Sequence, residues 1–523
     1  MTEASLWSGG RVFTGRRYVE SILVESGRVL FAGALGGARR LAPTGVERRA
    51  LGGSLLIPGL VDAHVHLSDL TRVREGFDLS ATRSLAELRD RLSAWAAEHP
   101  SGPIVGRGWD PERWKDGRWP EIRDVDPIVP DRSTVLYHAS GHAALLNSTA
   151  LRASGVLRAG SVRDPAMIGR AADGTPNGIL YEEALRIAGS VSSDRGPDAD
   201  GLARTLGVLV AHGLTAVGAM SASPHEVRAL RDLDASGRLP LTVRVYVRLS
   251  ELSAFSAPDL VAGSRRLSVV GVKAFLDGAF GPRTASLRRP YSDDPSNSGI
   301  PVGDDGELTH QLAEAGRRGL VPALHAIGDS AVERAARLLR PWTGRSGPPA
   351  RVEHAALTPP EALGPLFEAR PALVVQPGFV WSDSWLADRL GPARCRWAYA
   401  FRTLISRGFV VAGSSDAPYD PVDPWRGLRA AVDRRDPSGR SANPDPGEAL
   451  SPEEALGLYT TNAATSVGLP TYGHLEAGGA ADLVVLTTPD LPQALASGAP
   501  PVRETWVAGR RVYAAPGSVG QQA

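Results

Sequence analysis

Cysteine is almost absent from this chain, and Cys395 is the single one among 523 residues. No intrachain disulfide is therefore possible, which fits a reducing compartment. The sequence also lacks a basic N-terminal region followed by an apolar stretch, so we expect no signal peptide and a cytoplasmic protein. No run of about twenty apolar residues occurs, so we expect no membrane-spanning helix.

An excess of one sign of charge is also lacking, because 58 Lys and Arg residues are matched by 57 Asp and Glu residues. This balance argues against a broad electrostatic surface for nucleic acid. We therefore expect a small molecule as the partner, without nucleic acid or membrane, and leave a homo-oligomer open. Glycine (58) and proline (41) are abundant, which suits short loops between many elements.

Two histidines stand two residues apart in the stretch 62–68, after an apolar run that reaches Pro58-Gly59. Residues i and i+2 of a strand point to the same face, so His64 and His66 can bind one metal ion together. An isolated His-x-His pair is more often part of an ordinary strand. A metal site therefore requires further ligands elsewhere in the chain.

Beyond residue 200, apolar segments alternate with helical patterns. Buried strands that alternate with helices predict a parallel sheet, and eight of them predict an α/β fold with a closed (β/α)₈ TIM-like barrel. With the strand that carries the two histidines, the eight expected strands lie near residues 55–66, 213–218, 241–247, 267–275, 320–325, 350–354, 372–376 and 408–416.

The two ends of the chain are rich in short strands and Gly turns. We expect residues 1–57 and 474–523 to pair in one composite β-sandwich, which would bury edges that neither end can cover alone. The barrel would then span residues 58–473. Residues 68–200, which show no clear alternation of strands and helices, are predicted to form an insertion after the first barrel strand.

Polar residues end several of the predicted strands, where barrels of this type have their active sites. Each one alone has an ordinary explanation, such as a hydrogen-bonded structural histidine or a helix cap. Independent accidents would not bring all of them to one rim, so together they predict a metal centre. The residues are His64 and His66 on strand one, Lys273 on strand four, His325 on strand five, His354 on strand six and Asp416 on strand eight.

Lys273 lies within the apolar segment 267–275. An ammonium group is costly to bury without a partner, and metal ions would repel it. Either the pKa of Lys273 is strongly lowered, or the amine is chemically converted to an anion.

These residues form part of an ordered set of motifs that covers nearly the whole chain. The set resembles the metal-dependent amidohydrolase superfamily, and more closely its YtcJ-like branch, which includes the N-substituted formamide deformylases. The motifs are Pro58-Gly59-Leu60-Val61-Asp62-Ala63-His64-Val65-His66, Gly108-Trp109-Asp110, 141–148, 277–285, His325-Ala326-Ile327-Gly328-Asp329, Glu353-His354-Ala355, Gly413-Ser414-Ser415-Asp416-Ala417-Pro418 and 478–486.

The resemblance implies a barrel with a composite sandwich and a metal centre of one or two ions, often zinc. It implies that His64, His66 and Asp416 hold one ion and that His325 and His354 hold the other. Lys273 would be a carboxylated lysine that bridges them. The chain departs from the family pattern at Pro282, where small polar residues are common, and at Phe379, where many relatives carry a histidine.

The expected activity is metal-dependent hydrolysis of a carbon–nitrogen bond in a hydrophobic small molecule, with a non-peptide amide or N-substituted formamide as substrate. Metal-activated water would attack the carbonyl, and Asp416 would act as the catalytic proton acceptor and donor. A deaminase on the same scaffold and a non-catalytic scaffold protein are the alternatives. The residues expected to contact the substrate are Trp109, His142, Arg283, Phe379 and Trp381, although core packing remains an alternative for the tryptophans and a loop salt bridge for Arg283.

Overall fold

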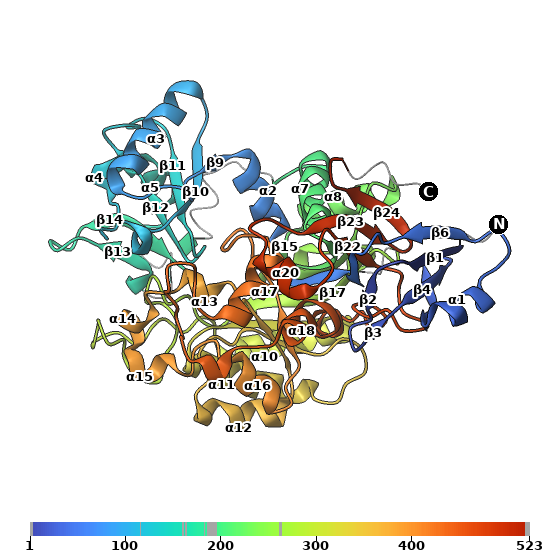
Figure 1. The fold of residues 1–523 in the computed structure, drawn as a ribbon. Coiled ribbons are helices and arrows are strands. Elements are labelled where there is room, and N and C mark those ends of the chain that lie inside the picture. The colour runs from blue at the N-terminus through green and yellow to red at the C-terminus, as the bar shows by residue number, and fades with distance from the viewer. Residues whose placement is uncertain are drawn as a thin grey trace.

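The computed structural model describes residues 4–115, 117–158, 162, 165–182, 184–185, 196–260 and 264–517. No helix within these ranges is long and apolar enough to cross a membrane. The described strands form one eight-stranded sheet, two six-stranded sheets and one four-stranded sheet. Figure 1 shows the eight-stranded sheet between a lobe at one end and the strands of the chain termini at the other.

The eight-stranded sheet is parallel throughout and nearly closed, as in a TIM-like barrel. Each strand predicted from the sequence overlaps one of its members, so the barrel prediction is confirmed. The strands are β8 (Leu60–Val65), β15 (Leu214–Ala222), β16 (Thr242–Arg248), β17 (Leu267–Phe275), β18 (Val321–Ala326), β19 (Arg351–His354), β20 (Ala372–Val375) and β21 (Val411–Gly413).

The first and last barrel strands meet just beyond the end of β21. The backbone N–H of Asp416 donates to the carbonyl of His64 at 2.9 Å, and the N–H of His66 donates to the carbonyl of Ala417 at 2.9 Å. The buried carboxylate of Asp62 accepts from the N–H of His64 at 3.0 Å and from the N–H and hydroxyl of Ser415 at 3.1 and 2.5 Å. This carboxylate therefore fixes the register between the strand that carries the two histidines and the loop that carries Asp416.

Helices cover the outside of the barrel, and α8 (Pro224–Ala235) shows why they form where they do. Ser223 caps it by accepting from the N–H of Glu226, and proline at the first position fits the fixed φ of a helix start. Val227, Leu230 and Leu233 are buried at helical spacing. The other main barrel helices are α2 (Leu67–Glu75), α7 (Ala199–Ala211), α10 (Asp305–Arg317), α11 (Asp329–Leu339), α12 (Pro360–Ala369) and α17 (Pro424–Asp433).

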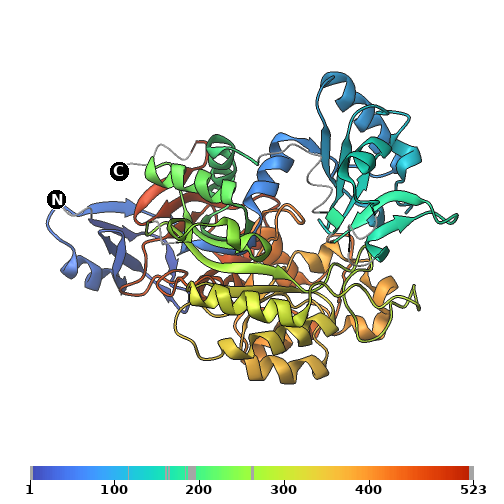
Figure 2. The ribbon, with the colours of Figure 1, turned by 180° about the vertical axis from the view of Figure 1, so that it is seen from behind.

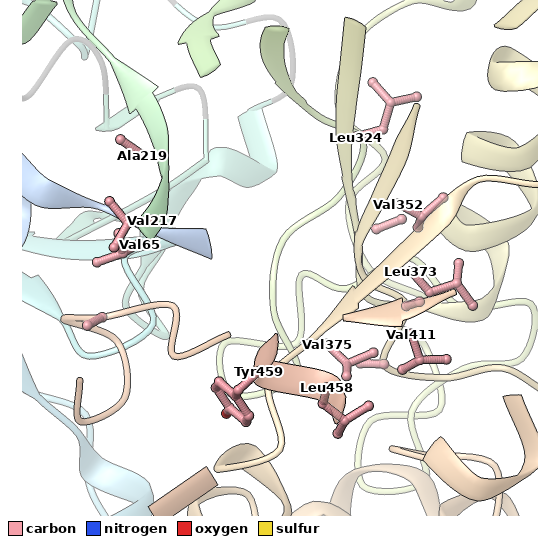
Figure 3. Packing of buried hydrophobic residues seen from close by; sticks show 14 of the residues in the cluster. Val65, Val217, Ala219, Leu324, Val352, Leu373, Val375, Val411, Leu458 and Tyr459 are labelled. Atoms are coloured by element: carbon pink, nitrogen blue, oxygen red, sulfur yellow. The ribbon is translucent and has the colours of Figure 1, made fainter. Parts of the chain in front are cut away.

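The main core fills the layer between the barrel and these helices. Leu324, Val352, Leu373 and Val411 are register partners on four consecutive strands and follow one another across the sheet in Figure 3. Side chains alternate along β19, so Val352 faces the helices. Its neighbours Arg351 and Glu353 face the interior of the barrel. Burying each such side chain stabilises the fold by about 1.5–3 kcal/mol.

A separate six-stranded sheet lies between β8 and β15 in the sequence and forms the lobe at the upper left of Figure 1, which Figure 2 shows from behind. It mixes parallel and antiparallel neighbours and has its own apolar clusters on both faces. We call it the insertion sheet. Its order is β13 (Ile168–Arg170), β14 (Pro176–Tyr181), β12 (Ala143–Leu146), β11 (Thr134–His138), β10 (Ile104–Trp109) and β9 (Phe77–Asp78).

The remaining two sheets are built from the ends of the chain, and the six-stranded one joins strands of both ends. One has the order β24 (Arg510–Ala514), β23 (Val502–Val507), β22 (Leu483–Leu486), β7 (Leu55–Pro58), β2 (Arg11–Phe13) and β3 (Tyr18–Val19). The other has the order β5 (Arg28–Gly33), β4 (Ser21–Glu25), β1 (Ala4–Ser8) and β6 (Glu47–Ala50). β7 and β22 pair antiparallel, and one apolar cluster includes residues of both sheets. The division into a composite sandwich and a barrel at residues 57 and 474 stays a prediction.

Gly218→Ala should destabilise the fold by about 1–3 kcal/mol, because a methyl group there would force β8 and β15 apart. A Cβ at Gly218 would lie 2.2 Å from the carbonyl oxygen of Ala63, immediately before His64. Thermal unfolding measures the effect.

The matched control is Gly207→Ala, on the exposed face of α7, where a Cβ would meet nothing within 4 Å. That change should be neutral or stabilising by up to about 1 kcal/mol. An equal melting temperature for Gly218→Ala and wild type would contradict the packing described for the first two strands.

Candidate metal centre

Three side chains converge where the first and eighth strands end. His64 Nε2 lies 3.3 Å from His66 Nε2 and 3.1 Å from Asp416 Oδ1, and His66 Nε2 lies 3.3 Å from the same oxygen. All three side chains are buried, and their ligand atoms lie within 4.8 Å of one another. Asp416 holds its backbone at φ 57°, a left-handed conformation that non-glycine residues adopt at a cost.

The donor atoms of this group fit a metal ion. Asp416 Oδ1 has no hydrogen-bond partner among the described residues, although it is buried. Burial alone would raise the pKa of Asp416, but the neighbouring His64 and His66 hold that pKa well below the usual range. Burial lowers the pKa of His66. A carboxylate with neutral imidazoles is the protonation state that binds a divalent cation.

A buried ion pair orients His64. His64 Nδ1 lies 2.6 Å from Glu353 Oε2, and a proton on Nδ1 would leave Nε2, 3.1 Å from Asp416 Oδ1, as the atom that faces a metal ion. Arg351 donates to both oxygens of Glu353, at 2.7 and 2.9 Å, and to the carbonyl of Ala63 at 2.8 Å. A carboxylate behind a histidine ligand fixes the tautomer and strengthens the ligand.

A second chain of hydrogen bonds orients His354. Ser414 Oγ donates to the carbonyl of Val375 at 2.9 Å, and Gln376 Nε2 donates to Ser414 Oγ at 3.0 Å. Gln376 Oε1 therefore accepts from His354 Nδ1, 2.8 Å away. This sequence of donors leaves His354 Nε2 unprotonated. Burial lowers the pKa of His354 to about 3, so the ring stays neutral.

His325 and Lys273 complete the rim. The rings of His325 and His354 have centroids 4.3 Å apart, and His325 Nε2 donates to the carbonyl of Gly278 at 3.0 Å, which leaves Nδ1 as its lone-pair atom. Lys273 Nζ lies 3.4 Å from His64 Nε2, and burial lowers the pKa of Lys273 to about 8. A neutral amine is therefore accessible near neutral pH. This agrees with the first alternative given for Lys273, a lowered pKa.

His142 reaches this centre from the insertion sheet. Its ring centroid lies 4.8 Å from that of His325, and its Nδ1 is 2.9 Å from Glu182 Oε2. Burial alone would lower the pKa of His142, but the Glu182 carboxylate raises it above the usual value. The insertion therefore contributes an oriented, largely buried imidazole beside the predicted metal ligands.

The other predicted substrate contacts are more scattered. Trp109 is fully buried in the core of the insertion sheet, where its ring N–H donates to the carbonyl of Leu136 at 2.8 Å. Arg283 forms an ion pair with Asp293 at 2.8 Å. Both positions match the structural alternatives noted for them. Phe379 and Trp381 are half-buried in the short helix α13 (Phe379–Ser382) that follows the seventh barrel strand, and their contact with a substrate stays a prediction.

Sequence reasoning assigned no role to Arg351, Glu353 or Gln376. A signal for the first two was present, because two opposite charges at i and i+2 inside a buried strand need one another. The contact of Glu353 with His64 joins residues 289 positions apart, which no local pattern reveals.

Glu353→Gln should lower metal affinity about 10- to 100-fold, because a neutral amide holds the His64 tautomer less firmly than a carboxylate. Titration of metal-free protein with zinc, followed by calorimetry, measures the change. The control is Glu333→Gln, whose carboxylate pairs with exposed Arg288 on the barrel surface. Zinc affinity equal to that of the control would contradict the orienting role of Glu353.

The sequence of this chain is similar to those of known proteins. The model of the amidohydrolase family, Amidohydro_3, matches residues 49–513. The amidohydrolase-family protein YtcJ of Bacillus subtilis strain 168 is 32% identical, with 92% of this chain and 94% of that protein covered. An N-substituted formamide deformylase of Arthrobacter pascens is 25% identical, with 89% and 90% covered.

Solved structures agree with these sequence matches. An uncharacterized metal-dependent hydrolase from Pyrococcus horikoshii OT3 superimposes with a TM-score of 0.75 at 30% identity, covering 92% of this chain and 97% of that chain. Since the family model extends over most of the sequence and includes all the rim residues described above, the chain belongs to the amidohydrolase family.

Proposed function

We propose that the protein is a metal-dependent hydrolase that cleaves the carbon–nitrogen bond of a non-peptide amide, with an N-substituted formamide as the preferred class. The convergence of His64 Nε2, His66 Nε2 and Asp416 Oδ1 within 3.3 Å carries this proposal. Three electron-rich atoms at such distances, one of them without a hydrogen-bond partner among the described residues, form a site for a cation. Zinc is the proposed ion, since imidazole nitrogen and carboxylate oxygen both suit it.

His64, His66 and Asp416 would hold one ion, and His325 and His354 would hold a second. A bound divalent ion supplies a Lewis acid for the amide carbonyl and a water of lowered pKa. Asp416 would receive the proton of the attacking water on its carboxylate and return it to the leaving nitrogen. His64 and His66 hold the pKa of Asp416 well below its usual range, so the free side chain is an ionised carboxylate.

The side chains around the rim support a hydrophobic substrate. Phe379, Trp381 and Trp385 are half-buried in the segment after the seventh barrel strand and pack against the main core. The Phe379 side chain offers no hydrogen bond to a substrate. A bulky apolar substituent on the amide nitrogen would find complementary surface there.

Lys273 is proposed to bridge the two ions as a carbamate. Its buried amine, with a pKa lowered to about 8, is partly unprotonated at neutral pH, and the unprotonated amine is the form that reacts with carbon dioxide. The resulting anion would remove the repulsion between an ammonium group and the metal ions.

N-formyl and N-acyl derivatives of benzylamine and of shorter alkylamines, incubated with zinc-loaded protein, should release the free amine. Asp416→Asn should lower the rate about 10²- to 10⁴-fold, because an amide cannot take the proton. Release of amine is measured by chromatography. Turnover of no member of the panel would contradict the proposal, and release of ammonia from amidine substrates would favour a deaminase instead.

Replacement of Lys273 tests the carbamate separately. Lys273→Glu supplies a permanent carboxylate and should keep two zinc ions per chain without added bicarbonate, whereas Lys273→Ala should lose about half of the bound zinc. Elemental analysis of the purified variants gives the count. A full complement of zinc in Lys273→Ala would remove Lys273 from the set of ligands.

A further inference from the structure

A polar cavity of about 130 Å³ adjoins the metal centre at the ends of the first three barrel strands. His66 forms a wall that the cavity shares with the predicted metal site. Its other walls include Asp69 and Arg72 from α2, Ser221 from β15, Glu226 from α8 and Arg248 from β16. The volume corresponds to about four water molecules, which is room for a small substituent of a bound substrate.

The charges that line this cavity are balanced. Asp69 contacts the guanidinium groups of Arg72 at 3.0 Å and Arg107 at 3.5 Å, and it accepts from the hydroxyl of Tyr419 at 3.1 Å. Arg248 pairs with Glu251 at 2.8 Å. A carboxylate in the cavity would meet Asp69 and Glu226, and an ammonium group would meet the two arginines, so neither charge is favoured.

Two polar groups in the wall have spare hydrogen-bonding capacity. Glu226 is 2% exposed, and its Oε2 accepts from the hydroxyl of Ser68, but its Oε1 has no partner among the described residues. The hydroxyl of Ser221 is also buried and without a partner in that part of the chain. A buried polar atom left unpaired costs about 1–3 kcal/mol, so a ligand that pairs with these groups would recover that free energy.

The backbone at Ser221, which lines this cavity, is strained. Ser221 has φ 54°, and the pairing of β15 with β16 shifts register between Ala219 and Ala222. This irregularity interrupts the alternation of the strand and aims the serine hydroxyl into the cavity wall. Strained backbone of this kind concentrates at functional sites.

We propose that this cavity is a substrate subsite for an uncharged group that both donates and accepts hydrogen bonds, a primary carboxamide, and that Ser221 and Glu226 determine this specificity. Burial raises the pKa of Glu226 to about 7, so its carboxyl group accepts from an N–H when ionised and donates to a C=O when protonated. The N–H of a carboxamide can donate to the ionised carboxylate of Glu226, and its C=O can accept from the protonated form. The Ser221 hydroxyl then pairs with the amide group that Glu226 leaves free. The proposal rests on the hydrolase function, because the carboxamide belongs to a substrate whose scissile bond lies at the metal centre.

Four N-formyl amines of equal length test the subsite, with a terminal carboxamide, carboxylate, ammonium or isopropyl group. Wild type should have the highest kcat/KM for the carboxamide, by about tenfold over the isopropyl analogue. Ser221→Gly suits the left-handed backbone and removes the CH₂OH side chain, and it should reduce this ratio about tenfold through KM. Glu226→Leu, close in shape, should do the same.

The matched control is Ser26→Gly, the same substitution at φ 51° in the exposed turn between β4 and β5, which should leave the ratio unchanged. A preference for the carboxylate or the ammonium substrate, or a ratio insensitive to Ser221→Gly, would overturn the subsite. Turnover of no compound would instead reject the hydrolase function. In that case, saturation-transfer NMR with propionamide, propionate and propylamine decides the subsite directly, since only propionamide should bind, and only to protein that retains Ser221.

Discussion

The site depends on the buried carboxylate of Asp62, which joins the two ends of the barrel. Its oxygens bind the backbone of His64 on the first strand and both the backbone and hydroxyl of Ser415 beside the eighth strand. Burial raises the pKa of Asp62 to about 6, and the hydrogen bonds from Ser415 and His64 oppose that rise. Together with the backbone hydrogen bonds from Asp416 to His64 and from His66 to Ala417, this contact holds Asp416 opposite the two histidines, so the closure of the barrel and the geometry of the metal site are one constraint.

Around that contact, buried polar groups are paired in chains that end at the predicted ligands. Arg351 and Glu353 lead to His64, and Ser414 and Gln376 lead to His354. Each chain places the proton of an imidazole on the nitrogen away from the centre and leaves the inner nitrogen as a lone pair. Such networks are costly to bury unless their members find partners, and here the hydrogen bonds of Glu353 and Gln376 fix the orientation of the two imidazoles.

The sequence predicts the barrel well because buried parallel strands appear as apolar runs between helices, and it predicts the rim because polar residues end those runs. It does not predict the insertion sheet, because a sheet of mixed strand directions lacks the regular alternation of strands and helices in its sequence. The sequence alone does not say whether Trp109 packs in a core or lines a pocket, because it does not show which residues contact its ring. The cavity beside His66 depends on a register shift at Ser221 and on contacts with Glu226, neither of which has a local signature.

The central claim is that His64, His66 and Asp416 bind a metal ion. Anomalous diffraction from zinc-loaded crystals, recorded on both sides of the zinc absorption edge, tests it most directly. The account predicts an anomalous peak about 2.0–2.2 Å from His64 Nε2, His66 Nε2 and an oxygen of Asp416, with His64 still bound to Glu353 through Nδ1. No peak among these three side chains, with Asp416 hydrogen-bonded to a protonated His64 in its place, would contradict it.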